Sequence, residues 1–236
     1  MNTTERLHLE GLHIIYRLCP DFPAEIVDRA RTRYNDRDSP YHNWSHIMAC
    51  FAALAEIEPR WVHPANSPPD GDGDGSHRYR PLILAILFHD VCYEPFSTWD
   101  EERSAGCLVA EGLRARLPLD ELMHAVRLVM QTKHDGPPTL DAAPFVDVMV
   151  DVDLSILGTK PEVFDKYEQQ IRQEYIVVED GDYAEGRHRV FQRFLDRPNI
   201  FQTPLGQTLW ERSARANIKR SLARLQALAD TAQADV

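Results

Sequence analysis

The sequence is poor in cysteine and in basic residues, and it has no long uninterrupted apolar run. Its four cysteines, Cys19, Cys50, Cys92 and Cys107, lie far apart without a Cys-x-x-Cys pair, so neither a zinc knuckle nor a disulfide framework is indicated. No stretch approaches the ~18 apolar residues that a membrane span requires. The first residues carry acidic groups within their apolar part and lack a signal-peptide core. We therefore expect a cytoplasmic protein that does not enter a membrane.

Acidic residues outnumber basic ones by 37 to 26, which gives the 236-residue chain a formal net charge of -11. Non-specific binding to a nucleic acid duplex needs a basic surface, so this balance argues against such a partner. A small phosphorylated substrate is still compatible with the negative net charge, because a metal ion or a few Arg and Lys side chains can make the local electrostatic field positive.

Apolar residues recur with helical spacing along nearly the whole chain, and no hairpin, repeat or long linker interrupts them. We therefore predict one all-α domain over 1–236. Asn43 is expected to cap a helix, and the apolar run that Pro81 opens is predicted to be a buried helix rather than a strand, because it does not alternate. Two segments are exceptions: 62–80, rich in Pro, Gly and Asp, is predicted to be a flexible loop insertion, and 230–236 a disordered tail.

Histidine and aspartate occur together at four places, which are His42 with His46, His89 with Asp90, His134 with Asp135, and Asp151 with Asp153. Most of these places lie on or beside apolar helices, where an unpaired imidazole or carboxylate is costly. A divalent cation would satisfy such groups together. Mixed imidazole and carboxylate ligation suits Mn, Fe, Co, Ni or Zn, with Mg less favoured. A single histidine is more often a structural residue, so it is the ordered set that predicts a metal site.

The ordered set resembles the HD superfamily of metal-dependent phosphohydrolases, whose pattern is His, then His-Asp, then Asp, all on helices of an all-α domain. The chain is most similar to the bacterial branch of predicted metal-dependent HD phosphohydrolases. The motifs that carry the resemblance read YHNWSHI, FHDVCY, ERSA, DVDLSILG and IRQEY, and they fall within a likeness that runs from about Leu7 to Leu222.

The resemblance implies one divalent cation held by His46, His89, Asp90 and Asp153 in the core of the helical bundle. His46 is preferred to His42 because the family's ligand stands at the start of an apolar helix, and His42 would then orient Asp90 or contact the phosphate. Asp153 is preferred to Asp151 because relatives with Asp-Leu-Ser at this point use that Asp.

Members of the family with two metals carry extra histidines between the His-Asp pair and the last Asp. This chain offers only His124 and His134 there. Ten residues separate them, which places them on different faces of one helix. A site for one metal is therefore favoured.

The implied reaction is attack on phosphorus by a water that the metal activates, with a nearby carboxylate as proton acceptor. Glu94, four residues after Asp90, is the first candidate, and Glu101 or Glu102 the second, although Glu101 also fits a capping box that begins at Thr98. The groups expected to contact the substrate phosphate are His42, Lys133, His134, Arg172 and Arg187.

The predicted function is thus hydrolysis of a small phosphorylated metabolite, with a nucleotide as the favoured substrate. One alternative is a phosphodiesterase or nucleotide pyrophosphatase of the same fold. Another is a sensory module that binds a metal or a nucleotide without turnover. The amphipathic last helix would also allow a homo-oligomer.

Overall fold

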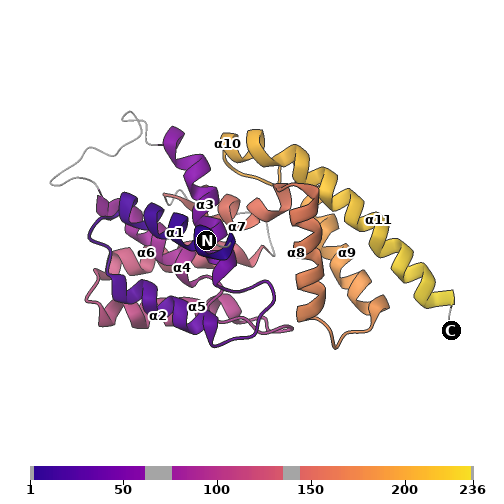
Figure 1. Ribbon diagram of the computed structural model, residues 1–236, viewed down its shortest axis with the longest axis horizontal. Coiled ribbons are helices and arrows are strands. Elements are labelled where there is room, and N and C mark those ends of the chain that lie inside the picture. Colours follow the sequence, from indigo (N-terminus) through magenta and orange to yellow (C-terminus); the bar gives the residue numbers. More distant parts are fainter. Residues whose placement is uncertain (1–2, 62–75, 135–143, 235–236) are drawn as a thin grey trace. The chain divides into compact units, whose positions relative to one another are not determined.

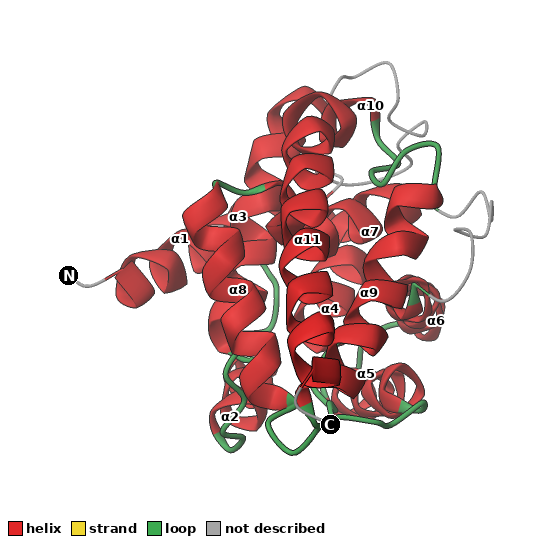
Figure 2. Ribbon diagram, turned by 90° about the vertical axis from the view of Figure 1, so that its right-hand side faces the viewer, coloured by secondary structure: helices red, strands yellow, loops and turns green. Residues whose placement is uncertain are grey.

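The computed structural model describes residues 3–61, 76–134 and 144–234. Every regular element in these ranges is a helix, as Figure 2 shows, so the predicted all-α class is confirmed. None of the described helices is both long enough and apolar enough to cross a membrane.

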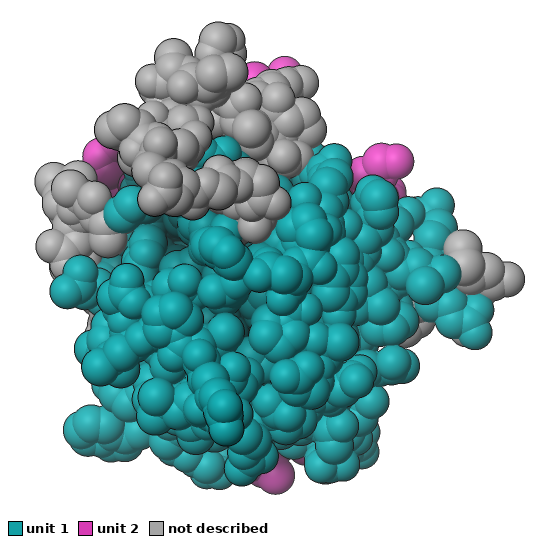
Figure 3. Space-filling view, turned by 90° about the vertical axis from the view of Figure 1, so that its left-hand side faces the viewer, with its two compact units in different colours: residues 1–153 teal, residues 154–236 magenta. Residues whose placement is uncertain are grey.

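The chain divides into two compact units, residues 1–153 and 154–236, which Figure 3 colours separately. The single domain predicted for 1–236 stays a prediction. The helices of unit 1 are labelled in Figure 1: α1 (Thr3–Leu18), α2 (Ala24–Asn35), α3 (Trp44–Trp61), α4 (Arg80–Phe88), α5 (Asp100–Arg114), α6 (Leu119–Met130) and α7 (Val146–Leu154), whose last residue begins unit 2. Short 3-10 helices at Ser76–Tyr79 and Gln131–Lys133 precede α4 and follow α6.

Unit 1 is organised around α4. All nine of its residues are buried, which confirms the buried helix predicted from the apolar run. It packs against α2, α3, α5 and α6, while α1 packs along α3. The charged first residue, Arg80, is tolerated because its guanidinium forms ion pairs with Glu121 at 2.9 Å and Asp21 at 3.2 Å.

The structure corrects three boundaries that the sequence predicted. Of the loop predicted for 62–80, residues 62–75 lie outside the described residues, but 76–79 are helical and Arg80 opens α4, because Pro81 suits a first turn. The helix α11 continues to Ala234, so 230–234 are not a disordered tail. No side chain caps α5: Asp100 is already helical and accepts a hydrogen bond from the amide of Glu94.

Unit 2 contains α8 (Pro161–Glu174), α9 (Asp180–Asp196), α10 (Pro204–Gly206), a π-helical turn (Gln207–Glu211) and α11 (Arg212–Ala234), preceded by a 3-10 helix (Ser155–Gly158). α11 packs along α9 and against this 3-10 helix, where the buried Asn217 donates to the carbonyl groups of Leu157 and Thr159. A Cβ atom at Gly158 would lie 2.3 Å from Cβ of Trp210, so only glycine fits there.

A buried carboxylate ties α5 to α2. Glu111, whose side chain is 3% exposed, forms ion pairs with Arg29 at 2.6 Å and Arg33 at 3.1 Å. Burial acts to raise the pKa of Glu111, but the guanidinium groups outweigh it and hold the pKa below its ordinary value. The charged form of Glu111 therefore stabilises the fold.

We expect Glu111→Gln to lower the free energy of unfolding by about 2 kcal/mol at pH 7, measured by urea denaturation. Because the pKa of Glu111 is lowered by folding, its contribution is complete above its ordinary pKa and is lost as the pH falls through the lowered value. The difference between the variant and the wild type should therefore shrink below about pH 4. A matched control is Glu10→Gln, whose carboxylate is half-exposed and pairs with Arg6 on the same helix, and which should cost less than about 0.5 kcal/mol. Equal costs at Glu10 and Glu111 would contradict the assignment.

Candidate metal centre

The first imidazole of the site is placed by the cap of α3. The side chain of Asn43 accepts a hydrogen bond from the amide of Ser45 and donates to the carbonyl groups of Ser39 and Pro40. This fixes the start of the helix as the sequence predicts. His46 therefore stands in the first turn of α3, with its ring only 6% exposed.

The second imidazole is placed by the end of α4. His89 Nδ1 lies 3.1 Å from the carbonyl oxygen of Ile86, so Nδ1 carries the proton and Nε2 is left as a donor atom for a metal. The following Asp90 is held through its backbone, because Arg37 donates to its carbonyl group at 2.9 Å and to that of His42 at 2.8 Å.

Four donor atoms from three elements converge in unit 1. His46 Nε2 lies 3.2 Å from His89 Nε2, 3.3 Å from Asp90 Oδ2 and 3.3 Å from Asp153 Oδ1. His89 Nε2 lies 3.2 Å from Asp90 Oδ2 and 3.3 Å from Asp153 Oδ1. The structure thus brings together the four residues that the sequence singled out.

These separations fit a divalent cation. Donor atoms 3.2–3.3 Å apart at the corners of a tetrahedron lie about 2.0 Å from its centre, and at the corners of an octahedron about 2.3 Å. These are the lengths of bonds from a divalent metal to nitrogen and oxygen. Two imidazoles and two carboxylates are also a donor set that divalent transition metals prefer.

A buried cysteine, Cys50, lies close to three of these four residues. His46, Cys50, His89 and Asp153 offer donor atoms that all lie within 4.8 Å of one another, and this group could hold a metal ion. Cys50 Sγ is 3.8 Å from both ring nitrogens of His46, so it lies beside the ring rather than in line with Nε2. A cation bound in line with Nε2 would lie more than about 4 Å from this sulfur, well beyond a Zn–S bond. No local pattern in the sequence pointed to Cys50.

The electrostatics of the cluster match its composition. Burial acts to lower the pKa of His46 and His89, but neighbouring acidic groups, Asp90 and Asp153 among them, hold both well above the ordinary value. Burial acts to raise the pKa of the two carboxyl groups, and the imidazoles hold both well below the ordinary value. Positive charge therefore stabilises the site, whether protons or a metal ion supply it.

Asp153 also reaches a third histidine. Its Oδ2 atom lies 2.9 Å from His134 Nε2, while Oδ1 faces the other two imidazoles. His134 has a left-handed backbone with φ 52°, and it follows the 3-10 turn after α6.

Asp135 lies outside the described residues. His124 is elsewhere, with Nε2 2.8 Å from the carbonyl oxygen of Pro144. Asp151 is fully buried in α7, and Asp153 is the residue of this pair that contacts His46 and His89.

His42 does not replace His46 in the cluster. Its ring stacks on Tyr93, with ring centroids 3.7 Å apart, and its charge acts on Asp90. This is compatible with the predicted role in orienting Asp90.

Glu94, the first candidate for the proton acceptor, lies at the surface. Its carboxylate is 64% exposed and pairs with Arg103 at 2.9 Å. Because α4 ends at Phe88, the spacing of four residues between Asp90 and Glu94 is not a spacing within that helix.

Glu101 remains close to the site. It lies in the first turn of α5 and is partly buried. Burial raises the pKa of its carboxyl group, the charge of Asp90 raises it further, and Lys133 acts against both. Glu102 instead forms an ion pair with Lys133, whose ammonium group lies 5.9 Å from the ring centroid of the exposed Trp99.

Arg172 and Arg187 lie in unit 2, and each has partners within that unit. Arg172 donates to the carbonyl groups of Tyr175 and Val178 and pairs with Asp180, so it holds the turn between α8 and α9.

Arg187 is bound in a comparable way. Its guanidinium pairs with Glu168, donates to the hydroxyl of Tyr167 and lies over the ring of Phe191. These contacts account for both cations, and long-range packing of this kind leaves no trace in local sequence.

A second donor group, Cys19, Asp21 and His77, is less suited to a cation. The guanidinium of Arg80 contacts both Asp21 and His77, so a positive charge is already present there.

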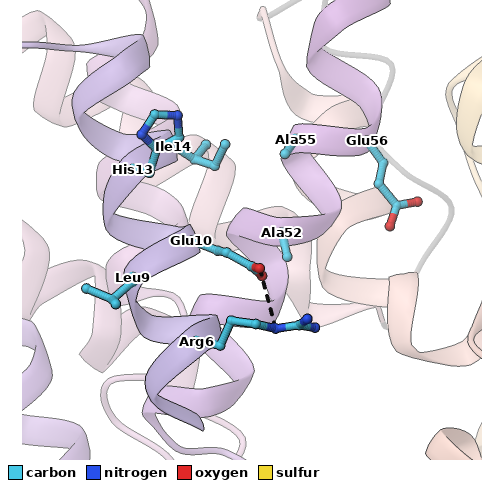
Figure 4. Close-up of a pocket in the computed structure, with 8 residues that line it drawn as sticks. All are labelled: Arg6, Leu9, Glu10, His13, Ile14, Ala52, Ala55 and Glu56. Atoms are coloured by element: carbon cyan, nitrogen blue, oxygen red, sulfur yellow. Dashed lines mark ion pairs between the residues drawn. The ribbon is translucent and has the colours of Figure 1, made fainter. Parts of the chain in front are cut away.

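A cavity of about 670 Å³ lies between α1 and α3. Figure 4 shows its lining, with Ala52 and Ala55 on one wall and the pair of Arg6 and Glu10 on the other. None of the residues lining this cavity belongs to the four-donor cluster.

No protein-family model, curated protein or solved structure matches the chain. The geometry of unit 1 therefore carries the functional argument.

If the cluster binds a metal only in the folded state, adding the metal must stabilise the protein. We expect Mn, Co, Ni or Zn at 100 times its dissociation constant to raise the free energy of unfolding by about 2.7 kcal/mol, and a chelator to remove this gain. His89→Ala should abolish the response, while the control His124→Ala should keep it. A wild-type unfolding curve that ignores both metal and chelator would rule out the site.

Proposed function

We propose that the protein is a metal-dependent phosphohydrolase that acts on a small phosphorylated metabolite, with a nucleotide as the favoured substrate. The observation that carries the proposal is that His46 Nε2 and His89 Nε2 lie 3.2–3.3 Å from each other and from one carboxylate oxygen of both Asp90 and Asp153. The same four residues carry the resemblance of the sequence to HD phosphohydrolases, so geometry and motif support one another.

These four side chains would hold one divalent cation. When bound, such an ion supplies Lewis-acid activation of water and of a phosphoryl oxygen. The protein keeps the donors in place through bonds outside the cluster, since His89 is fixed by the carbonyl of Ile86 and the Asp90 backbone by Arg37.

Glu101 is the proposed proton acceptor. It is partly buried, and the charge of Asp90 acts on its carboxyl group, as expected for a neighbour of the cluster. A raised pKa brings a carboxylate closer to neutral pH, where it exchanges protons most effectively.

Lys133 and His134 are the proposed contacts for the phosphate. His134 touches Asp153, and Lys133, the preceding residue, acts electrostatically on Glu101. The ammonium group pairs with Glu102, and a dianionic phosphate would compete with that carboxylate for it.

The proposal is tested with a panel of nucleotides and simple phosphate esters, each assayed with Mn, Co, Ni and Mg. We expect phosphate release by the wild type and loss of both bound metal and hydrolysis in Asp90→Ala, measured by metal analysis and phosphate detection. Asp90→Ala that keeps its metal and its rate would refute the assignment. Release of pyrophosphate or of a nucleotide would indicate the anhydride or diester reaction, and metal binding without turnover a sensory module.

A second variant separates proton transfer from metal binding. Glu101→Gln should retain the metal and lower kcat by about 10²- to 10⁴-fold, because it removes only the proton acceptor. The control is Glu94→Gln, whose carboxylate is exposed and pairs with Arg103, and which should leave kcat unchanged. The role of Glu101 is excluded if both variants behave alike.

A further inference from the structure

Two cysteines far apart in sequence meet beside the loop that carries Asp90. Cys92 lies in the segment between α4 and α5, and Cys107 lies within α5. Their Sγ atoms are 3.5 Å apart, and both residues are free thiols. We propose that Cys92 and Cys107 are a modification site, at which a small disulfide such as glutathione disulfide closes a reversible disulfide bond. This inference does not rest on the proposed hydrolase activity.

The backbone around the pair is already fixed in a suitable position. The amide of Cys92 donates to Ser104 Oγ at 3.0 Å, and this hydroxyl donates back to the carbonyl of Cys92 at 3.3 Å. Ser104 is fully buried and lies one helical turn before Cys107 in α5. Closing the sulfur–sulfur distance from 3.5 Å to about 2.05 Å therefore needs a small adjustment of the side chains.

Exposure separates this pair from the other two cysteines. Cys92 and Cys107 are partly exposed, whereas Cys19 and Cys50 are buried at 0% and 1%. An oxidant from solvent therefore reaches the first two thiols and not the others.

Charge around the pair also favours the exchange. The guanidinium of Arg33 interacts with both thiols, and that of Arg103 with Cys92, so a thiolate formed there has positive neighbours.

The chemistry balances without any further reactant. One cysteine attacks glutathione disulfide as its thiolate, which forms a mixed disulfide and releases one glutathione. The second cysteine then attacks the protein sulfur of that mixed disulfide and releases the second glutathione. One bond forms in the protein, which loses two hydrogen atoms, and one bond is lost in the oxidant, which is reduced to two thiols.

The bond would have a defined structural effect. It closes a loop between residues 15 apart in sequence, so it would tie the segment that follows Asp90 to the helix that begins near Glu101. A cross-link of this length restricts the unfolded chain and raises thermal stability.

The test uses the full-length, reduced protein incubated with glutathione disulfide, followed by alkylation of the remaining thiols and peptide mass analysis. We expect a peptide linked through Cys92 and Cys107, loss of two of the four free thiols, and a rise in Tm of several degrees. Dithiothreitol should reverse all three changes.

Matched variants identify the sulfur atoms involved. Cys107→Ser and Cys92→Ser should each lose the linked peptide and the rise in Tm, while Cys19→Ser should keep both. The wild-type comparison stands even if a variant folds poorly. The proposal is overturned by four alkylated thiols, by separate glutathione adducts on the two cysteines, or by an unchanged Tm after the bond has formed.

Discussion

The constraint on which unit 1 depends is the burial of two imidazoles and two carboxylates next to an apolar helix. Removing such groups from water costs several kcal/mol for each charge unless opposite charges meet them. His46, His89, Asp90 and Asp153 meet this condition by facing one another at 3.2–3.3 Å, and their pKa values move in the directions that favour opposite charges. Because the donors come from α3, the end of α4 and α7, the site forms only when those elements have packed together.

The same arrangement explains why the surrounding bonds go to the backbone. Arg37 holds the carbonyl groups of His42 and Asp90, and the carbonyl of Ile86 holds the ring of His89. These bonds set the direction of the donor atoms while leaving the side-chain nitrogen and oxygen donors of the cluster unoccupied by them. Glu101, Lys133 and His134 then surround it with one carboxylate, one ammonium group and one further imidazole.

Local patterns predicted most of the fold and the order of the central residues. The run from Pro81 gave a buried helix, Asn43 gave a cap, and the spaced His and Asp residues gave the cluster. The ion pair of Glu94 with Arg103 could not be read from its spacing to Asp90, because α4 ends at Phe88 and the chain between the two helices follows no helical period. The roles of Arg172 and Arg187, the position of Cys50 and the contact of Cys92 with Cys107 depend on tertiary packing, which no local spacing encodes.

The complete burial of α4 has a consequence for what its last turn can attract. The terminal peptide groups of a helix expose carbonyl oxygens and a partial negative charge of about half an electron. In α4 this end directly precedes His89 and Asp90 and is shielded from water, so neither solvent nor dissolved salt weakens its field. The main chain itself thus adds to the attraction for a positive ion, and substitution of the ligand side chains would leave this macrodipole intact.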